Sequence, residues 1–292
     1  MVILVYFAPL FFGIMTIDST KVLKIYRTLD KDQLQFVFDK KIEDTLAIEA
    51  WLKKLYKIAE MDAIGDESRK KSGVLSLVFG ILTALTVVLT ITKPILFFFP
   101  IAFFILFAYF LITYFLLRKI DIGNNMRLFI VPLLEHLDRK GSVDKPFYLR
   151  MDFTDPIKKE YLSQTVEEEK ERPVNIYRHH WMDGKLVFKD GVKITWEIND
   201  VVTKKHSQVQ EKESTDETSG RYQIQHILNM HFSAPKENFS PVNKDMMETD
   251  DGMYYIVSIH KKDVSESLDH GMSPQVFISS VEEGYHFVEP KT

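Results

Sequence analysis

Two uncharged apolar runs constrain what this chain can fold into. Residues 74–92 and 95–117 are separated only by Lys93 and Pro94. At about 1.5 Å rise per residue, a helix of either length reaches across the ~30 Å hydrocarbon core of a bilayer. Two intervening residues suffice only for a tight antiparallel turn. The runs therefore predict a transmembrane helical hairpin over residues 73–117, with a buried hairpin in a soluble core as the alternative.

Basic residues flank the predicted hairpin on its outer side. Arg69, Lys70 and Lys71 precede the first run, and Arg118 and Lys119 follow the second, whereas the turn contains one lysine. Cytoplasmic ends of membrane helices are enriched in Lys and Arg. We therefore expect both outer ends of the hairpin in the cytoplasm and only the turn outside. Neither run contains Asp, Glu, Lys, Arg or His, the residues that line proton and ion pathways.

The residues before the hairpin divide into an apolar run and a polar segment. Residues 2–17 are apolar, but a helix of this length spans only about 24 Å. We interpret residues 1–17 as a third transmembrane helix, with a segment lying on the membrane surface as the alternative. Residues 18–72 are predicted to be a cytoplasmic helical segment, because apolar residues recur there at helical spacing. Asp30 or Asp32 is expected to cap its helix.

The residues after the hairpin change from helical to alternating periodicity. Residues 118–141 have one apolar side and are predicted to form a juxtamembrane amphipathic helix, which lies on the membrane or docks on the following domain. Residues 142–292 contain about eight alternating segments, including residues 276–281 and 285–288. The predicted fold class is therefore an α+β membrane protein whose cytoplasmic β-rich domain is an antiparallel β-sandwich or a partly open β-barrel.

Turn signals and polar stretches complete this picture of residues 142–292. Asp190-Gly191 predicts a hairpin between residues 185–189 and 192–202, because this turn favours residues that tolerate positive φ. Residues 154–173 are interpreted as a solvated excursion. Residues 210–220 contain no apolar side chain to bury and are interpreted as a mobile hairpin tip.

Charge is distributed unevenly along the chain. Residues 118–292 hold 24 Lys and Arg against 30 Asp and Glu, whereas residues 1–117 hold 13 against 11. Nucleic-acid binding depends on neutralising phosphates, so the acidic half argues against a nucleic-acid partner. The expected partners are the lipid bilayer, through the basic juxtamembrane residues, and a protein. A homo-oligomer could form on the small residues of the first apolar run.

The sequence contains few patterns of residues that carry chemistry. The chain has no cysteine, which removes disulfides, thiolate metal sites and thiol nucleophiles. His179 and His180 are adjacent and His226 and His231 are five apart, so in strands the members of each pair point to opposite faces. The four carboxylates of residues 245–252 lack the order of a calcium loop. We therefore predict no catalytic, metal-binding or cofactor-binding residue and lean against an enzyme.

Three segments carry a family resemblance. They are Phe-Ile-Val-Pro-Leu-Leu-Glu-His-Leu at residues 129–137, the predicted strand at residues 146–153, and Trp-Met-Asp-Gly running into Phe-Lys-Asp-Gly at residues 181–191. In these segments the chain resembles an uncharacterised family of bacterial membrane proteins in which a transmembrane helical hairpin precedes a small β-rich domain. The resemblance covers about residues 118–205. It implies the same architecture and a bacterial origin, so the membrane expected is a bacterial inner membrane, and it implies no activity or site residue.

We therefore expect a membrane-anchored interaction or scaffold protein that presents an acidic β-rich domain at the cytoplasmic membrane face. The alternative is a membrane-associated hydrolase with its site on loops of the β-domain, and a third reading is an oligomeric pore-forming protein or membrane effector. A deep pocket that gathers histidines or carboxylates would favour the enzyme. A shallow surface with an exposed apolar or aromatic patch would favour the binding protein.

Overall fold

The computed structural model describes residues 19–141, 143, 146–166, 174–206, 220–242, 249–250, 252–266 and 271–291. The chain divides into two compact units. The helical unit comprises residues 1–38 and 56–122, and the sheet unit comprises residues 39–55 and 123–292. The predicted third transmembrane helix, residues 1–17, lies outside the described residues.

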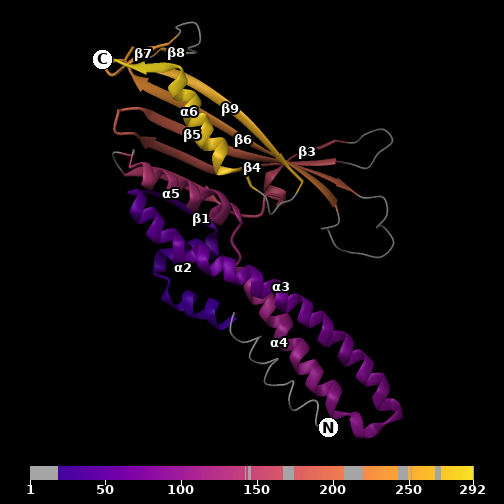
Figure 1. The fold of residues 1–292 in the computed structure, drawn as a ribbon. Helices are drawn as coiled ribbons and strands as arrows, with labels where there is room; N and C mark the ends of the chain where they lie inside the picture. Colours follow the sequence, from indigo (N-terminus) through magenta and orange to yellow (C-terminus); the bar gives the residue numbers. More distant parts are fainter. Residues whose placement is uncertain are drawn as a thin grey trace. The chain divides into compact units, whose positions relative to one another are not determined.

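Two short and two long helices make up the described part of the helical unit (Figure 1). They are a helix over residues 19–28, α2 (Lys31–Asp39), α3 (Ile48–Thr92) from residue 56 onward, and α4 (Phe98–Ile120). Both α3 and α4 are long and apolar enough to cross a membrane, judged by length and composition. The turn that joins them runs from Lys93 to Phe97 and includes a short 3₁₀ helix, so it is longer than the two residues predicted.

Aromatic rings and a glycine pack α4 against α3. Phe79 of α3 is buried and stacks on Phe110 of α4, with 5.7 Å between the ring centroids. A Cβ atom on Gly80 of α3 would lie 3.3 Å from the Phe107 ring of α4. The small-residue side of the first apolar run therefore contacts the second helix of the same chain. Many other large apolar side chains of the two helices remain exposed, as expected for a surface that contacts lipid.

A strand interrupts the segment predicted to be helical, which corrects the expectation for residues 18–72. α2 begins with reciprocal capping bonds, in which Asp30 Oδ1 accepts from the Gln33 N–H at 2.8 Å and Gln33 Oε1 accepts from the Asp30 N–H at 3.0 Å. Lys40 then adopts a φ of +56°, outside the helical range. The next residues, Lys41–Leu46, form strand β1 of the sheet unit. Pairing with a distant strand overrides the local helical spacing.

An eight-stranded antiparallel sheet dominates the sheet unit. Its strands are β1 (Lys41–Leu46), β2 (Phe147–Asp152), β3 (Leu162–Val166), β4 (Val174–Val187), β5 (Lys193–His206), β6 (Gly220–Pro235), β8 (Thr249–Asp250) and β9 (Tyr254–Ser265). Their order is β1-β2-β4-β5-β6-β9-β8, with β3 also paired to β4. A separate small sheet pairs β7 (Phe239–Pro241) with β10 (Val288–Pro290). The predicted β4–β5 hairpin is confirmed, since Gly191 in its turn has a φ of +87°.

Helices cover one face of this sheet (Figure 1). A π-helical turn (Met126–Ile130) leads into α5 (Val131–Lys140), and α6 (Pro274–His286) follows β9. Phe277 of α6 packs edge-on against Trp196 of β5, with 5.0 Å between the ring centroids. Phe129 packs in the same manner against Trp181 of β4, at 5.7 Å. The apolar side of the segment predicted as an amphipathic helix therefore contacts the sheet.

The predicted β-sandwich or barrel is wrong, because helices take the place of a second large sheet. Residues 276–281 were expected to be a strand and belong to α6. The start of α6 carries a helix signal that the alternating pattern obscures. Ser273 Oγ accepts from the Gln275 N–H at 3.3 Å, and Pro274 occupies the first turn. Among the described residues the larger sheet is a single open layer with helices on one face.

The two stretches predicted as loops are described only in part. Residues 162–166 lie within the predicted excursion and form β3, an edge strand whose side chains are all exposed. Pairing with β4 explains this difference, since a polar segment can add its backbone to a sheet edge without burying side chains. Residues 167–173 and 207–219 lie outside the described residues.

Candidate functional site

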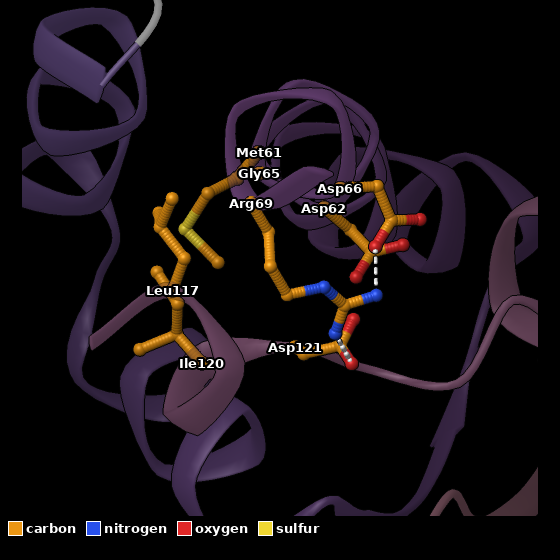
Figure 2. A pocket seen from close by; sticks show the side chains of 8 residues that line it. All are labelled: Met61, Asp62, Gly65, Asp66, Arg69, Leu117, Ile120 and Asp121. Atoms are coloured by element: carbon orange, nitrogen blue, oxygen red, sulfur yellow. Dashed lines mark hydrogen bonds and ion pairs between the residues drawn. The ribbon is translucent and has the colours of Figure 1, made fainter. Parts of the chain in front are cut away.

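Charged side chains hold together the base of the α3–α4 hairpin in the helical unit. Arg69 of α3 donates from Nη2 to Asp66 Oδ1 at 2.9 Å and from Nη1 to Asp121, which directly follows α4 (Figure 2). Asp62 Oδ1 accepts the backbone N–H of Ile122 at 3.0 Å. The small pocket between these side chains is also lined by Met61, Gly65, Leu117 and Ile120. Because two carboxylates neutralise Arg69, we interpret this pocket as an ion-pair clamp and assign no ligand to it.

The face of the sheet opposite α5 and α6 forms a second candidate, which we call the open face. Backbone pairing aligns its polar side chains across five strands, because residues directly opposite one another share a face. All of these side chains are exposed or half-buried. They are Arg150, His180, Asp183, Glu197, Asn199, Asn229, His231, Ser258 and His260.

A β-bulge in β4 brings His180 and Asp183 together on the open face. In a regular strand, residues three apart point to opposite faces. The pairing of β4 with β5 shifts at Trp181, which is the extra residue. His180 consequently lies opposite Asn199, and Asp183 lies opposite Glu197. Bulges commonly re-aim side chains in this way, often near functional sites.

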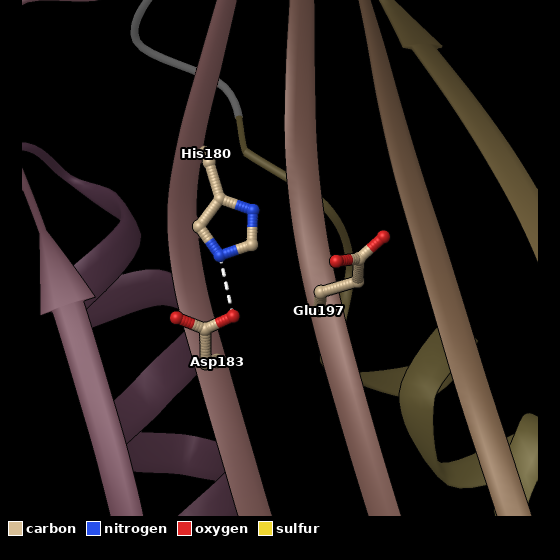
Figure 3. A group of neighbouring side chains, drawn as sticks. All are labelled: His180, Asp183 and Glu197. Carbon is tan, nitrogen blue, oxygen red and sulfur yellow. Dashed lines mark hydrogen bonds and ion pairs between the residues drawn. The ribbon is translucent and has the colours of Figure 1, made fainter.

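His180, Asp183 and Glu197 form a compact group on two adjacent strands (Figure 3). His180 Nε2 contacts Asp183 Oδ1, and the other ring nitrogen lies 2.8 Å from Asn199 Oδ1. One nitrogen or oxygen atom from each of the three side chains lies within 4.8 Å of the others. The side chains of His180 and Asp183 are 32% and 25% exposed, so the group is partly shielded from water. One imidazole and two carboxylates are ligand types that hold a divalent metal ion.

Hydrogen bonds extend this group across the neighbouring strands. Arg150 of β2 donates from Nη1 to Asp183 Oδ2 at 2.6 Å. Asn229 of β6 donates from Nδ2 to Glu197 Oε1 at 2.7 Å, and its Oδ1 accepts from His260 Nδ1 at 2.6 Å. The side chains are therefore oriented before any ligand binds, which lowers the entropic cost of binding.

Two aspartate–histidine pairs are buried on the helix-covered face. His226 Nδ1 donates to Asp200 Oδ1 at 2.7 Å, and the Trp181 indole N–H donates to the same oxygen at 3.0 Å. His179 Nε2 lies 3.6 Å from Asp152 Oδ1. These aspartate and histidine side chains are only 2–8% exposed. The pockets that α5 forms with α6 and with the start of α3 are lined by other residues, so we interpret both pairs as structural.

Several hydrogen bonds and an ion pair stabilise the charge of the buried Asp152 carboxylate. Lys41 Nζ lies 2.8 Å from its Oδ2, and Thr154 donates to its Oδ1 from both the backbone N–H and Oγ1. Burial by itself would raise the pKa of the Asp152 carboxyl. The His179 ring beside the carboxylate, followed by the bonds from Lys41 and Thr154, outweighs this effect and holds that pKa far below its ordinary value. Asp152 is therefore ionised throughout the neutral range.

Replacing Asp152 by asparagine is expected to lower the free energy of unfolding of the sheet unit by about 2 kcal/mol at neutral pH, because charge-assisted hydrogen bonds are lost. A carboxyl with a depressed folded-state pKa adds stability above its unfolded-state pKa of about 3.9 and loses it as the pH falls. The wild type should therefore lose stability below about pH 4 more steeply than Asp152→Asn.

Denaturant unfolding at several pH values, monitored by tryptophan fluorescence, measures this difference in stability. The probe reports on the right part of the chain because all three tryptophans lie in the sheet unit. The exposed Glu160→Gln serves as the control and should change the free energy of unfolding by less than about 0.5 kcal/mol. Parallel pH profiles for the wild type and Asp152→Asn would contradict the role given to Asp152.

The structure places the histidines as their spacing predicts. His179 is buried on one face and His180 lies on the other, and likewise His226 is buried and His231 is exposed. The prediction of no metal-binding or cofactor-binding residue stays a prediction. Spacing alone could not reveal the His180 group, because its geometry depends on the bulge. Most of the acidic stretch at residues 245–252 lies outside the described residues.

Comparisons with known proteins identify no relative of this chain. It matches no protein-family model, no curated protein and no solved structure. The family resemblance of residues 118–205 therefore carries no argument about function. What the chain does has to follow from its own residues.

Proposed function

We propose that this chain is a membrane-anchored binding protein, which holds its sheet unit at the cytoplasmic face of a bacterial inner membrane and binds a partner protein on the open face. The length and composition of α3 and α4, with exposed apolar side chains along both helices, support the anchor. The basic residues at the outer ends of the hairpin favour the cytoplasmic orientation.

The ordered polar network of the open face is the observation that carries this proposal. Helices α5 and α6 cover the other face of the sheet, and no described helix of the sheet unit lies on this one (Figure 1). Side chains from β2, β4, β5, β6 and β9 are hydrogen-bonded to one another across the strands. A surface ordered in this way loses little side-chain entropy on binding. The acidic balance of residues 118–292 favours a partner with a basic surface.

A hydrolase and an oligomeric pore are less well supported. The pockets described beside α5 are lined by residues other than the buried aspartate–histidine pairs, and the His180 group lies on a sheet face. Gly80, on the small-residue side of α3, contacts Phe107 of its own chain. That side of α3 is therefore already used within the hairpin.

Photo-crosslinking in living cells tests the binding surface. A photo-reactive amino acid in place of His231 or His260, both exposed on the open face, should give a crosslinked product of higher mass. Ser279 is also exposed but lies on α6, which covers the opposite face, and it should give none. Absence of a product from both open-face positions, or an equally strong product from Ser279, would contradict the proposal.

A further inference from the structure

We propose that His180, Asp183 and Glu197 bind one divalent transition-metal ion of the zinc class, a site that goes beyond the binding function proposed above and does not depend on it. The three side chains offer one imidazole nitrogen and two carboxylate oxygens within 4.8 Å of one another. Zinc takes such ligands at about 2.0–2.2 Å, so side-chain rotations must adjust these separations and open space for the ion between His180 Nε2 and the Asp183 carboxylate. Three protein ligands leave a fourth position for water or a further ligand.

The hydrogen bond between His180 and Asn199 leaves the other ring nitrogen as a metal ligand. Asn199 Oδ1 can only accept, so His180 Nδ1 carries the proton and donates across 2.8 Å. In a neutral imidazole, Nε2 would then present its lone pair to the Asp183 carboxylate (Figure 3). Two acceptors that face each other repel unless a cation lies between them. A histidine that donates its second ring N–H to an oxygen is typical of metal-bound histidines.

Neighbouring side chains also orient the two carboxylates. Asn229 holds Glu197 Oε1 at 2.7 Å. Arg150 holds Asp183 Oδ2 at 2.6 Å, and the second oxygen of Asp183 faces His180. With a neutral imidazole, these two carboxylates and Arg150 carry one net negative charge. The group therefore attracts a cation and supplies the outer hydrogen bonds that metal sites use.

A proton is the competing cation at this position. If His180 Nε2 binds a proton, His180 and Asp183 form an ordinary ion pair that Arg150 extends. Such an ion pair does not need Glu197, whereas the metal site requires it as the third ligand. Glu197 therefore distinguishes the two occupants.

Metal titration of the full chain, purified in detergent without a histidine tag, distinguishes a bound metal ion from a bound proton. We expect one Zn²⁺ ion per chain, and Co²⁺ should produce a visible absorption band that Zn²⁺ removes. His180→Gln and Glu197→Gln should each weaken Zn²⁺ binding by at least about tenfold, because each removes one of three ligands. His231→Gln, on the same face but outside the group, is the matched control and should bind as the wild type does.

Asn199→Ala tests the positioning of the His180 ring. It should weaken Zn²⁺ binding by about 10- to 100-fold while the Co²⁺ band keeps its shape at saturating Co²⁺, because the ligands themselves remain. An unchanged affinity would mean that the hydrogen bond between Asn199 and His180 does not prepare the ring for metal.

The proposed metal site is contradicted if the wild type binds no Zn²⁺, or if Glu197→Gln binds Zn²⁺ as tightly as the wild type does. An equal loss in His231→Gln would also overturn it, since the affinity would then not belong to this group. Tryptophan-monitored unfolding without metal establishes that each variant is folded. Should His180→Gln fail to fold, Glu197→Gln decides alone, because only the metal site, and not the ion pair, requires Glu197. None of these outcomes depends on the partner protein.

Discussion

Replacing Gly184 by alanine is expected to destabilise the sheet unit by about 3 kcal/mol or more. A Cβ atom at Gly184 of β4 would lie 2.0 Å from Cζ2 of Trp196, its neighbour on β5. The indole cannot move aside, because Trp196 is only 5% exposed and packs against Phe277 of α6. Overpacking a dense core costs about 1–3 kcal/mol and occasionally more, and a clash this close belongs at the upper end.

Denaturant unfolding of the detergent-solubilised chain measures this effect through tryptophan fluorescence. Gly123→Ala is the matched control in the same unit. Its new methyl group would lie 3.6 Å from Phe153, an ordinary contact, so the change should stay below about 1 kcal/mol. An unchanged unfolding midpoint for Gly184→Ala would contradict the packing of Trp196 on this glycine.

Local patterns predicted the two apolar helices, the cap of α2 and the β4–β5 hairpin. The apolar helices follow from uninterrupted runs of span length. Asp30 caps α2 through Gln33, three residues away, and Gly191 supplies the positive φ of its own turn. Each of these features depends on residues close together in the chain, so periodicity and turn chemistry are sufficient to predict it.

Features that depend on contacts between residues far apart in the chain were not predicted. Residues 41–46 become a strand because they pair with β2, which comes much later in the chain. Residues 276–281 alternate like a strand but form a helix that lies on the sheet, where Gly284 meets the ring of Phe232. A short apolar segment fits both periods, and the tertiary contacts decide between them.

The His180 group was missed for a related reason. His180 and Asp183 are three residues apart, which predicts opposite faces in a regular strand. The extra residue at Trp181 reverses this relation, and its presence is a property of the pairing with β5. Glu197, in contrast, lies on the face that simple alternation along β5 predicts.

The turn between α3 and α4 is expected to be reachable from outside the membrane, whereas the sheet unit is not. The basic residues at both outer ends of the hairpin favour this orientation, because positive charges near membrane helices are retained in the cytoplasm. Passing one Lys or Arg through the bilayer centre costs about 2.5–3.5 kcal/mol on insertion scales. The native chain has no cysteine, so a single introduced thiol is a unique labelling site.

Thiol labelling of Lys93→Cys and Ser279→Cys in intact spheroplasts tests the membrane anchor most directly. Both positions are exposed, one in the turn and one on α6 of the sheet unit. A membrane-impermeant maleimide should label Lys93→Cys before the membrane is permeabilised and Ser279→Cys only afterwards. Labelling of Ser279→Cys in intact spheroplasts, or of neither position until they are opened, would contradict a membrane-spanning hairpin with a cytoplasmic sheet unit.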